Sequence, residues 1–209
     1  MGKYEKGVEV AKKAIQLDPD SPVGYLQLAF HQQYEGHLKE AEDALRRAAE
    51  RKLEMPELLF QRYDLAFLNN DTAEMERTVA LAKGKPDAED LLALREGFVL
   101  AYSGHLQQAR KKSQRAAELS RQSGQPGRTA LVFSPAALWE GFFGNASAAR
   151  QGARAALALS KDRDVEYGAA FALALPPSLK HSRVIWKSAS RKIAPSGSLT
   201  RRPFARFSR

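Results

Sequence analysis

The chain of 209 residues contains no cysteine, so disulfide bonds, thiolate nucleophiles and cysteine-ligated zinc sites are excluded. It also lacks the ~18 consecutive apolar residues of a membrane-spanning helix. Its N-terminus has no apolar stretch typical of a secretory signal. We therefore expect a cytoplasmic protein that does not cross a membrane.

Motifs typical of enzymes are absent as well. The sequence has no Gly-x-Ser-x-Gly elbow, no phosphate-binding loop and no dinucleotide fingerprint. The equivalent turn positions of His37 and His105 keep them apart in any stacked array, which argues against a shared metal. We therefore predict that the protein is not an enzyme and that it has no catalytic residue, cofactor or metal site.

Acidic residues are absent from the last part of the chain. Residues 176–209 hold nine of the 33 Lys and Arg residues and no Asp or Glu. The remaining 24 basic residues match the 24 Asp and Glu residues of positions 1–175, so the net charge of +9 belongs to the tail. This shift predicts a neutral domain over 1–175, followed by a basic tail of low order over 176–209.

A short pattern recurs at a fixed spacing along the domain. A turn-forming residue, usually followed five positions later by Ala or another apolar residue, occurs at Gly2, Gly36, Asn70, Gly104 and Gly144. The first three intervals are each 34 residues, and the last is 40. Such a period indicates stacked repeats of one supersecondary unit.

Each unit has the pattern of a helical hairpin. After the turn at Gly36, Leu38, Ala41, Leu45 and Ala48 are spaced by three or four residues, which places them on one helical face. The small residues let neighbouring helices approach closely, and the leucines fill the space between them. Connectors that contain proline, such as those at Pro22, Pro56 and Pro86, separate the units. The longest interval includes a stretch over 122–128, which we expect to be an inserted loop.

The segment Gly36-His37-Leu38-Lys39-Glu40-Ala41 and its copies resemble the turn of the tetratricopeptide repeat, as does the period of 34. Residues 4–19 resemble the second helix of such a repeat and its closing Leu-Asp-Pro. Residues 150–175 are similar to repeats attached to acidobacterial serine/threonine protein kinases and related regulators. Met75 and Gln32 depart from the family pattern. The resemblance implies an all-α, right-handed α-solenoid of about five hairpins over residues 2–175.

The resemblance also implies a non-enzymatic scaffold that binds a peptide or helix of a partner protein in a concave groove lined by the first helices. Such an array can serve as the docking or sensory segment of a larger signalling protein. The expected groove residues are Tyr25, Gln32, Arg62, Tyr63, Arg95, Glu96 and Phe98.

The two ends of the chain depart from the repeat pattern. The sequence begins on a turn, so the first repeat is truncated and Val8, Ala11 and Ala14 lack their covering helix. Either a partner covers them, or the natural protein begins earlier. After Leu175 the helical pattern stops. Residues 176–209 form either a basic arm that binds nucleic acid or another anionic surface, or an out-of-frame translation of a final repeat.

Overall fold

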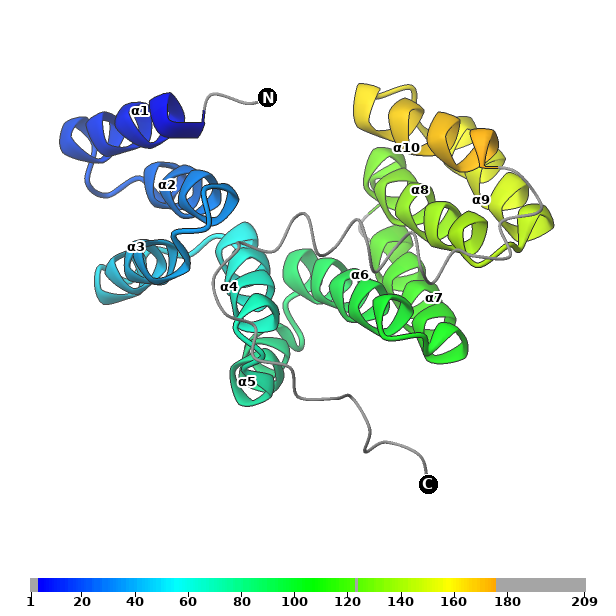
Figure 1. Ribbon diagram of the computed structural model, residues 1–209, viewed down its shortest axis with the longest axis horizontal. Helices are drawn as coiled ribbons and strands as arrows, with labels where there is room; N and C mark the ends of the chain where they lie inside the picture. The colour runs from blue at the N-terminus through cyan, green and yellow to red at the C-terminus, as the bar shows by residue number, and fades with distance from the viewer. Residues whose placement is uncertain (1–3, 123, 176–209) are drawn as a thin grey trace.

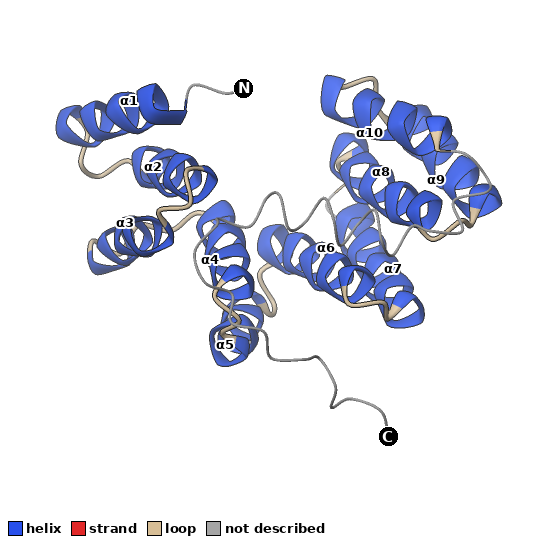
Figure 2. Ribbon diagram, viewed as in Figure 1, coloured by secondary structure: helices blue, strands red, loops and turns tan. Residues whose placement is uncertain are grey.

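The computed structural model describes residues 4–122 and 124–175, and within these ranges it contains ten α-helices and no strand (Figures 1 and 2). The helices are α1 (Tyr4–Leu17), α2 (Pro22–Tyr34), α3 (Leu38–Glu50), α4 (Pro56–Leu68), α5 (Thr72–Ala82), α6 (Pro86–Tyr102), α7 (Leu106–Gln122), α8 (Pro126–Phe142), α9 (Ala146–Leu159) and α10 (Arg163–Ala174). None of these helices meets the length and hydropathy that a membrane span requires. The turn predicted at Gly2 and the tail over 176–209 lie outside the described residues.

The helices form a curved array of two layers. Helices α2, α4, α6 and α8 lie along the inner side of the curve, and α3, α5, α7 and α9 lie along the outer side (Figure 1). Each inner helix pairs with the outer helix that follows it in the chain. The described residues therefore hold four complete hairpins, flanked by the single helices α1 and α10, whereas the sequence predicted about five. The prediction of an all-helical solenoid is confirmed.

A left-handed residue closes every hairpin at the position that the repeat predicts. Gly36, Asn70, Gly104 and Gly144 have φ values of 82°, 58°, 87° and 80°. In each turn the next residue donates its backbone N–H to the carbonyl five positions earlier, at 2.8 Å. This bond ends a helix while satisfying one of its last carbonyls, and it needs a residue that tolerates positive φ.

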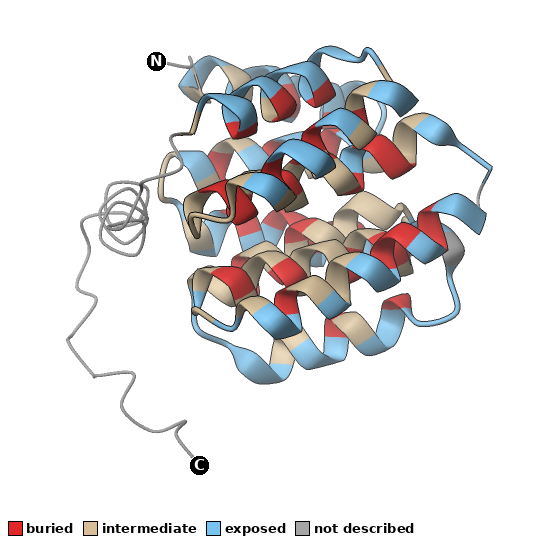
Figure 3. Ribbon diagram, turned by 90° about the vertical axis from the view of Figure 1, so that its right-hand side faces the viewer, coloured by how far each residue is buried: buried red, intermediate tan, exposed pale blue. Residues whose placement is uncertain are grey.

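Small residues bring the two layers together. Ala41, Leu45 and Ala48 are buried as predicted, with exposed fractions of 0%, 4% and 1%. A Cβ atom added at Gly97 would lie 3.3 Å from the carbonyl oxygen of Ala109, so α6 and α7 would have to move apart slightly to fit a larger residue there. Figure 3 shows buried residues along the sides where helices face one another.

The expected loop over 122–128 is shorter than predicted. Helix α7 continues to Gln122 and α8 begins at Pro126. Helices α7 and α8, which make up this interval, have 17 residues each, against 13 in both α2 and α3. The extra residues of this interval therefore lengthen the helices.

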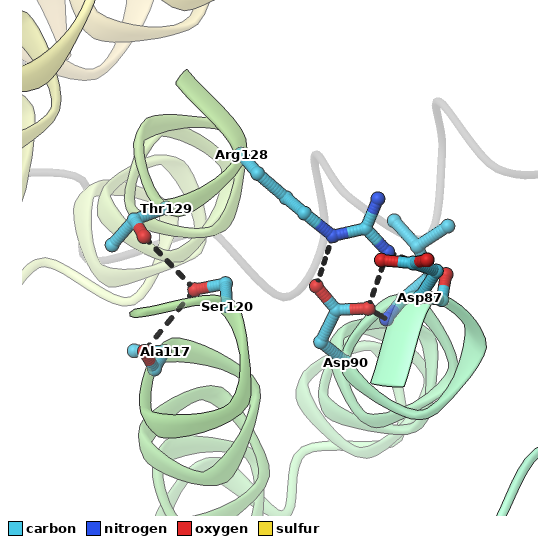
Figure 4. A network of polar contacts seen from close by, with 7 residues as sticks. Asp87, Asp90, Ala117, Ser120, Arg128 and Thr129 are labelled. Carbon is cyan, nitrogen blue, oxygen red and sulfur yellow. Dashed lines mark hydrogen bonds and ion pairs between the residues drawn. The ribbon is translucent and has the colours of Figure 1, made fainter. Parts of the chain in front are cut away.

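A buried ion pair joins the starts of α6 and α8 (Figure 4). Asp90 is fully buried and accepts hydrogen bonds from Arg128 Nε at 2.5 Å and Nη2 at 2.6 Å. Arg128 also donates to the backbone carbonyl of Asp87. Nearby, Ser120 Oγ at the end of α7 lies 3.2 Å from Thr129 Oγ1, within hydrogen-bonding distance. This network fixes the third hairpin against the fourth.

We expect Arg128→Met to lower the free energy of unfolding by about 3 kcal/mol, because it leaves the Asp90 carboxylate buried without its partner. The double variant Asp90→Leu/Arg128→Met removes both charges and should lose less stability than Arg128→Met alone. Urea denaturation measures each value. Arg46→Met is the control, because Arg46 is 60% exposed in its pairs with Asp43 and Glu50. A double variant less stable than Arg128→Met would contradict the account.

Candidate functional site

The structure places three of the seven predicted groove residues in the interior. Tyr25 is 2% exposed and its hydroxyl donates to the Pro19 carbonyl at 3.1 Å. Tyr63 is 3% exposed and Gln32 is 8% exposed. All three support packing between helices, so a partner on the surface has little access to them.

Three further predicted residues contact other helices of the array. Arg62 lines a cleft of about 830 Å³ among α3, α4, α5 and the start of α6, and its Nε lies 3.8 Å from Glu74 Oε1 on α5. Glu96 accepts a hydrogen bond from Lys112 Nζ on α7 at 2.7 Å. Phe98 is half-buried in the cluster around Trp139. Arg62 therefore faces the outer helices.

Arg95 is the predicted residue that organises a site between inner helices. Its guanidinium carbon lies 3.8 Å from the centre of the Phe60 ring, and its Nη2 lies 3.3 Å from Asp64 Oδ2. Both partners belong to α4, whereas Arg95 belongs to α6. Burial raises the pKa of the Tyr34 hydroxyl at the end of α2, Tyr4 adds to this effect, and Arg95 and Asp64 act on the same hydroxyl in opposite directions. We call Tyr34, Phe60, Asp64 and Arg95 the Arg95 cluster.

Sequence reasoning missed three members of the Arg95 cluster, although one signal was present. Asp64 is the one acidic residue between Leu58 and Leu68, a stretch that is mostly apolar or aromatic apart from Gln61 and Arg62, which indicates a carboxylate held among packed side chains. Its pairing with Arg95 depends on how α4 packs against α6. The angle between α4 and α6 is set by tertiary packing, so the spacing of residues along either helix does not reveal it.

The surroundings of the Arg95 cluster raise the pKa of its carboxyl group and that of a neighbouring phenol, the Tyr63 hydroxyl. Burial raises the pKa of Asp64 to about 6, because loss of hydration outweighs the attraction of Arg95. Burial also raises the pKa of the Tyr63 hydroxyl, and the negative charges of Glu96 and Asp64 add to this effect. Arg95 keeps one donor unused, since its buried Nε has no acceptor among the described residues.

Aromatic side chains contact one another on or between the inner helices, beyond the residues that the sequence singled out. The pairs are Phe30 with Tyr34, Phe67 with Tyr102, and Phe142 with Phe171, at ring-centre distances of 4.6, 5.5 and 6.1 Å. Phe30 and Tyr34 are 38% and 52% exposed. Phe30 therefore extends the exposed aromatic surface of the Arg95 cluster beyond Tyr34.

Comparisons with known proteins add no further constraint. No protein-family model, no curated protein and no solved structure matches the chain. Over residues 4–122 and 124–175, no group of three or more His, Asp or Glu residues could hold a metal ion. The site is therefore defined by the geometry of the Arg95 cluster alone.

Asp64 gives the fold a measurable pH dependence. Its folded-state pKa of about 6 lies above the value of 3.8 for an unperturbed aspartate. Between these values the folded chain holds a proton that the unfolded chain has released, so stability falls as pH rises through this window. We expect Asp64→Asn to reduce this fall by about 2 kcal/mol. The full displacement corresponds to ~3 kcal/mol, which partial contact with water lowers.

The measurement is the free energy of unfolding of both proteins by urea at several pH values. Arg95→Met provides a second variant: Arg95 lowers the folded-state pKa of Asp64, so its removal should extend the upper end of the window to higher pH. Identical pH dependence in the wild type and in Asp64→Asn would show that Asp64 is not the titrating group.

Proposed function

We propose that the protein is a tetratricopeptide-type scaffold that binds a peptide segment of a partner protein on the inner side of the array. The scaffold recognises the peptide segment by its shape and charge and catalyses no reaction on the partner. The array then serves as a docking segment, including within a larger signalling protein. The alternative of a nucleic-acid binder concerns the tail over 176–209, which lies outside the described residues.

The observation that carries this proposal is the Arg95 cluster. Three successive inner helices contribute to it, so one extended ligand can contact several repeats at once. Tyr34 and Phe30 provide exposed aromatic surface, and Arg95 is held in place by Phe60 and Asp64. A guanidinium that is already oriented loses less freedom when it binds a carbonyl or carboxylate of the ligand.

The placement of two arginines supplies a matched test. Arg95 lies in the cluster between α4 and α6, whereas Arg62, on the same helix as Asp64, lines the cleft toward α3 and α5. Their side chains are similarly exposed, at 30% and 28%. The sequence assigned both residues to one groove, whereas their ion-pair partners lie on different helices, Glu74 on α5 for Arg62 and Asp64 on α4 for Arg95.

We expect Arg95→Ala to weaken binding about tenfold, which corresponds to ~1.4 kcal/mol, while Arg62→Ala binds like the wild type. An array of short synthetic peptides first identifies ligands of the wild type, and fluorescence anisotropy with those peptides then measures the affinity of each variant. Circular dichroism confirms that both variants keep the helical content of the wild type. Equal affinity of Arg95→Ala and the wild type for every peptide would contradict the proposed site.

A further inference from the structure

The Arg95 guanidinium has hydrogen-bond donors that the fold leaves unused. Among the described residues its side chain donates no hydrogen bond, and its buried Nε has no acceptor. Its Nη2 lies 3.3 Å from Asp64 Oδ2, which makes an ion pair without a hydrogen bond. An arginine carries five N–H donors in a planar fork. Stacking on the Phe60 ring orients this fork and uses none of those donors.

Two other arginines of the array show how a carboxylate fills such a fork. Arg128 donates Nε and Nη2 to the two carboxylate oxygens of Asp90, at 2.5 and 2.6 Å. Arg110 donates the same two groups to Glu140, at 2.5 and 2.7 Å. This paired contact is the strong form of the arginine–carboxylate interaction. The Arg95 cluster lacks it, so a second carboxylate can still gain hydrogen bonds there.

The unfilled fork lies where a ligand can approach it. The side chains of Arg95 and Asp64 are 30% and 22% exposed. In the filled fork of Arg128, by contrast, the Asp90 carboxylate is 1% exposed. The contact between Arg95 and Asp64 can therefore be exchanged from solvent while the helices stay packed.

The ionisable groups near Asp64 belong to three helices. Arg95 and Glu96 lie on α6, Tyr34 lies on α2 and Tyr63 lies on α4. Glu96 is paired with a lysine of α7 at 2.7 Å. The pKa of each tyrosine hydroxyl is raised, chiefly by burial, so both hydroxyls are uncharged near neutral pH. The net charge of the cluster is therefore set by Arg95 and Asp64.

The other helices that pack against α4 place their charges on its opposite side. Arg62 faces Glu74 of α5, and at the end of α4 Asn69 donates to Glu42 of α3. Arg62 precedes Asp64 by two residues, which places it about 200° away around the helix. These charges therefore act on Asp64 less than Arg95 does.

Protonation of Asp64 changes what an incoming carboxylate meets. While Asp64 is ionised, its negative charge cancels that of Arg95 and repels a second carboxylate. When Asp64 is protonated, the positive charge of Arg95 remains and the carboxylic acid gains a donor. Burial raises the pKa of Asp64 to about 6, so the two states exchange close to neutral pH.

We infer that the Arg95 cluster binds a carboxylate of the peptide together with one proton, which Asp64 takes up from solvent as it gives up Arg95 to the ligand. This inference rests on the proposed function, since it names the chemical group that the site recognises and the pH at which it binds. Because linkage is reciprocal, a ligand that prefers the protonated site binds more weakly as pH rises.

The test measures affinity against pH with matched peptides. The probes are the synthetic peptides that bind the wild type in the peptide array. Each is also made with Asn and Gln in place of Asp and Glu, with an amidated C-terminus, and with both changes. We expect binding of a carboxylate-bearing form to weaken by up to about tenfold from pH 5.5 to pH 8, because ionised Asp64 withdraws the contribution of Arg95. The change that abolishes this decline tells a side-chain carboxylate from the C-terminus.

Two variants fix the ends of the range. Asp64→Asn cannot ionise, so it should bind at pH 8 as tightly as the wild type binds at pH 5.5. Arg95→Ala should bind weakly at every pH and show no decline. Asp43→Asn is the control, because it removes a carboxylate that is 50% exposed on α3, and it should follow the wild type. Circular dichroism at each pH confirms that the variants are folded.

Titration calorimetry detects the proton in the wild type and needs no variant. The heat of binding in two buffers with different ionisation enthalpies gives the number of protons taken up per peptide. A tenfold coupling between ligand and proton corresponds to an uptake of about half a proton at about pH 6.5.

Four results would overturn the inference. Equal affinity from pH 5.5 to pH 8 without proton uptake would do so and leave the proposed function standing. A decline that persists in Asp64→Asn would show that another group takes up the proton. Affinity that rises with pH would indicate a cationic group on the ligand. Failure of every peptide to bind would overturn the proposed function, and this inference with it.

Discussion

The architecture depends on a backbone constraint, the left-handed residue that closes each hairpin. Reversing the chain directly after a helix requires positive φ, which costs about 1 kcal/mol or more for most residues and little for glycine. Gly36, Gly104 and Gly144 meet this requirement, and Asn70 meets it with the side chain that best tolerates the conformation. Because each turn has the same left-handed residue and the same closing hydrogen bond, each outer helix returns along its inner helix in the same register. The two layers of the array follow from that register.

The register in turn decides which residues must be small. Ala29 packs in one cluster with Ala41 in one hairpin, and Gly97 lies opposite Ala109 in another, where an added Cβ would lie 3.3 Å from the Ala109 carbonyl oxygen. In the hairpin of α4 and α5, Tyr63 and Met75 stand at these positions. Larger side chains keep two helices further apart. The cleft of about 830 Å³ adjoins this hairpin, so the departure of its sequence from the repeat pattern has a structural counterpart.

Spacing along the chain predicted the turns, the hairpins and the small core residues, because these features depend on contacts within one repeat. It did not predict the site, because the Arg95 cluster depends on contacts between repeats. Asp64 and Arg95 are 31 residues apart, and their approach depends on the rotation of α6 against α4. The packing of α4 against α3 and α5 directs Arg62 toward the outer helices. Spacing assigns a residue to a helix and to an approximate face. The neighbours across that face are fixed only when the helices pack.

The junctions between repeats also differ in what holds them. Beyond α6, paired charges join neighbouring hairpins: Arg128 with Asp90, and Arg110 with Glu140 at 2.5 and 2.7 Å. Between α2 and α4, Gln33 bonds Gln61, a neutral pair. Asn69, at the end of α4, also donates to Glu42 of α3, and no ion pair is found across this junction among the described residues. Since the stability of an array is the sum over its repeats and junctions, we expect this junction to open more readily than those joined by ion pairs. Tyr34 belongs to α2, whereas Phe60, Asp64 and Arg95 belong to α4 and α6, so the cluster spans that junction. Its fixed part is the arginine with its carboxylate and aromatic ring, and its adjustable part is the tyrosine. A site built in this way can orient one polar group of a ligand firmly while its apolar surface adapts to the side chain beside that group.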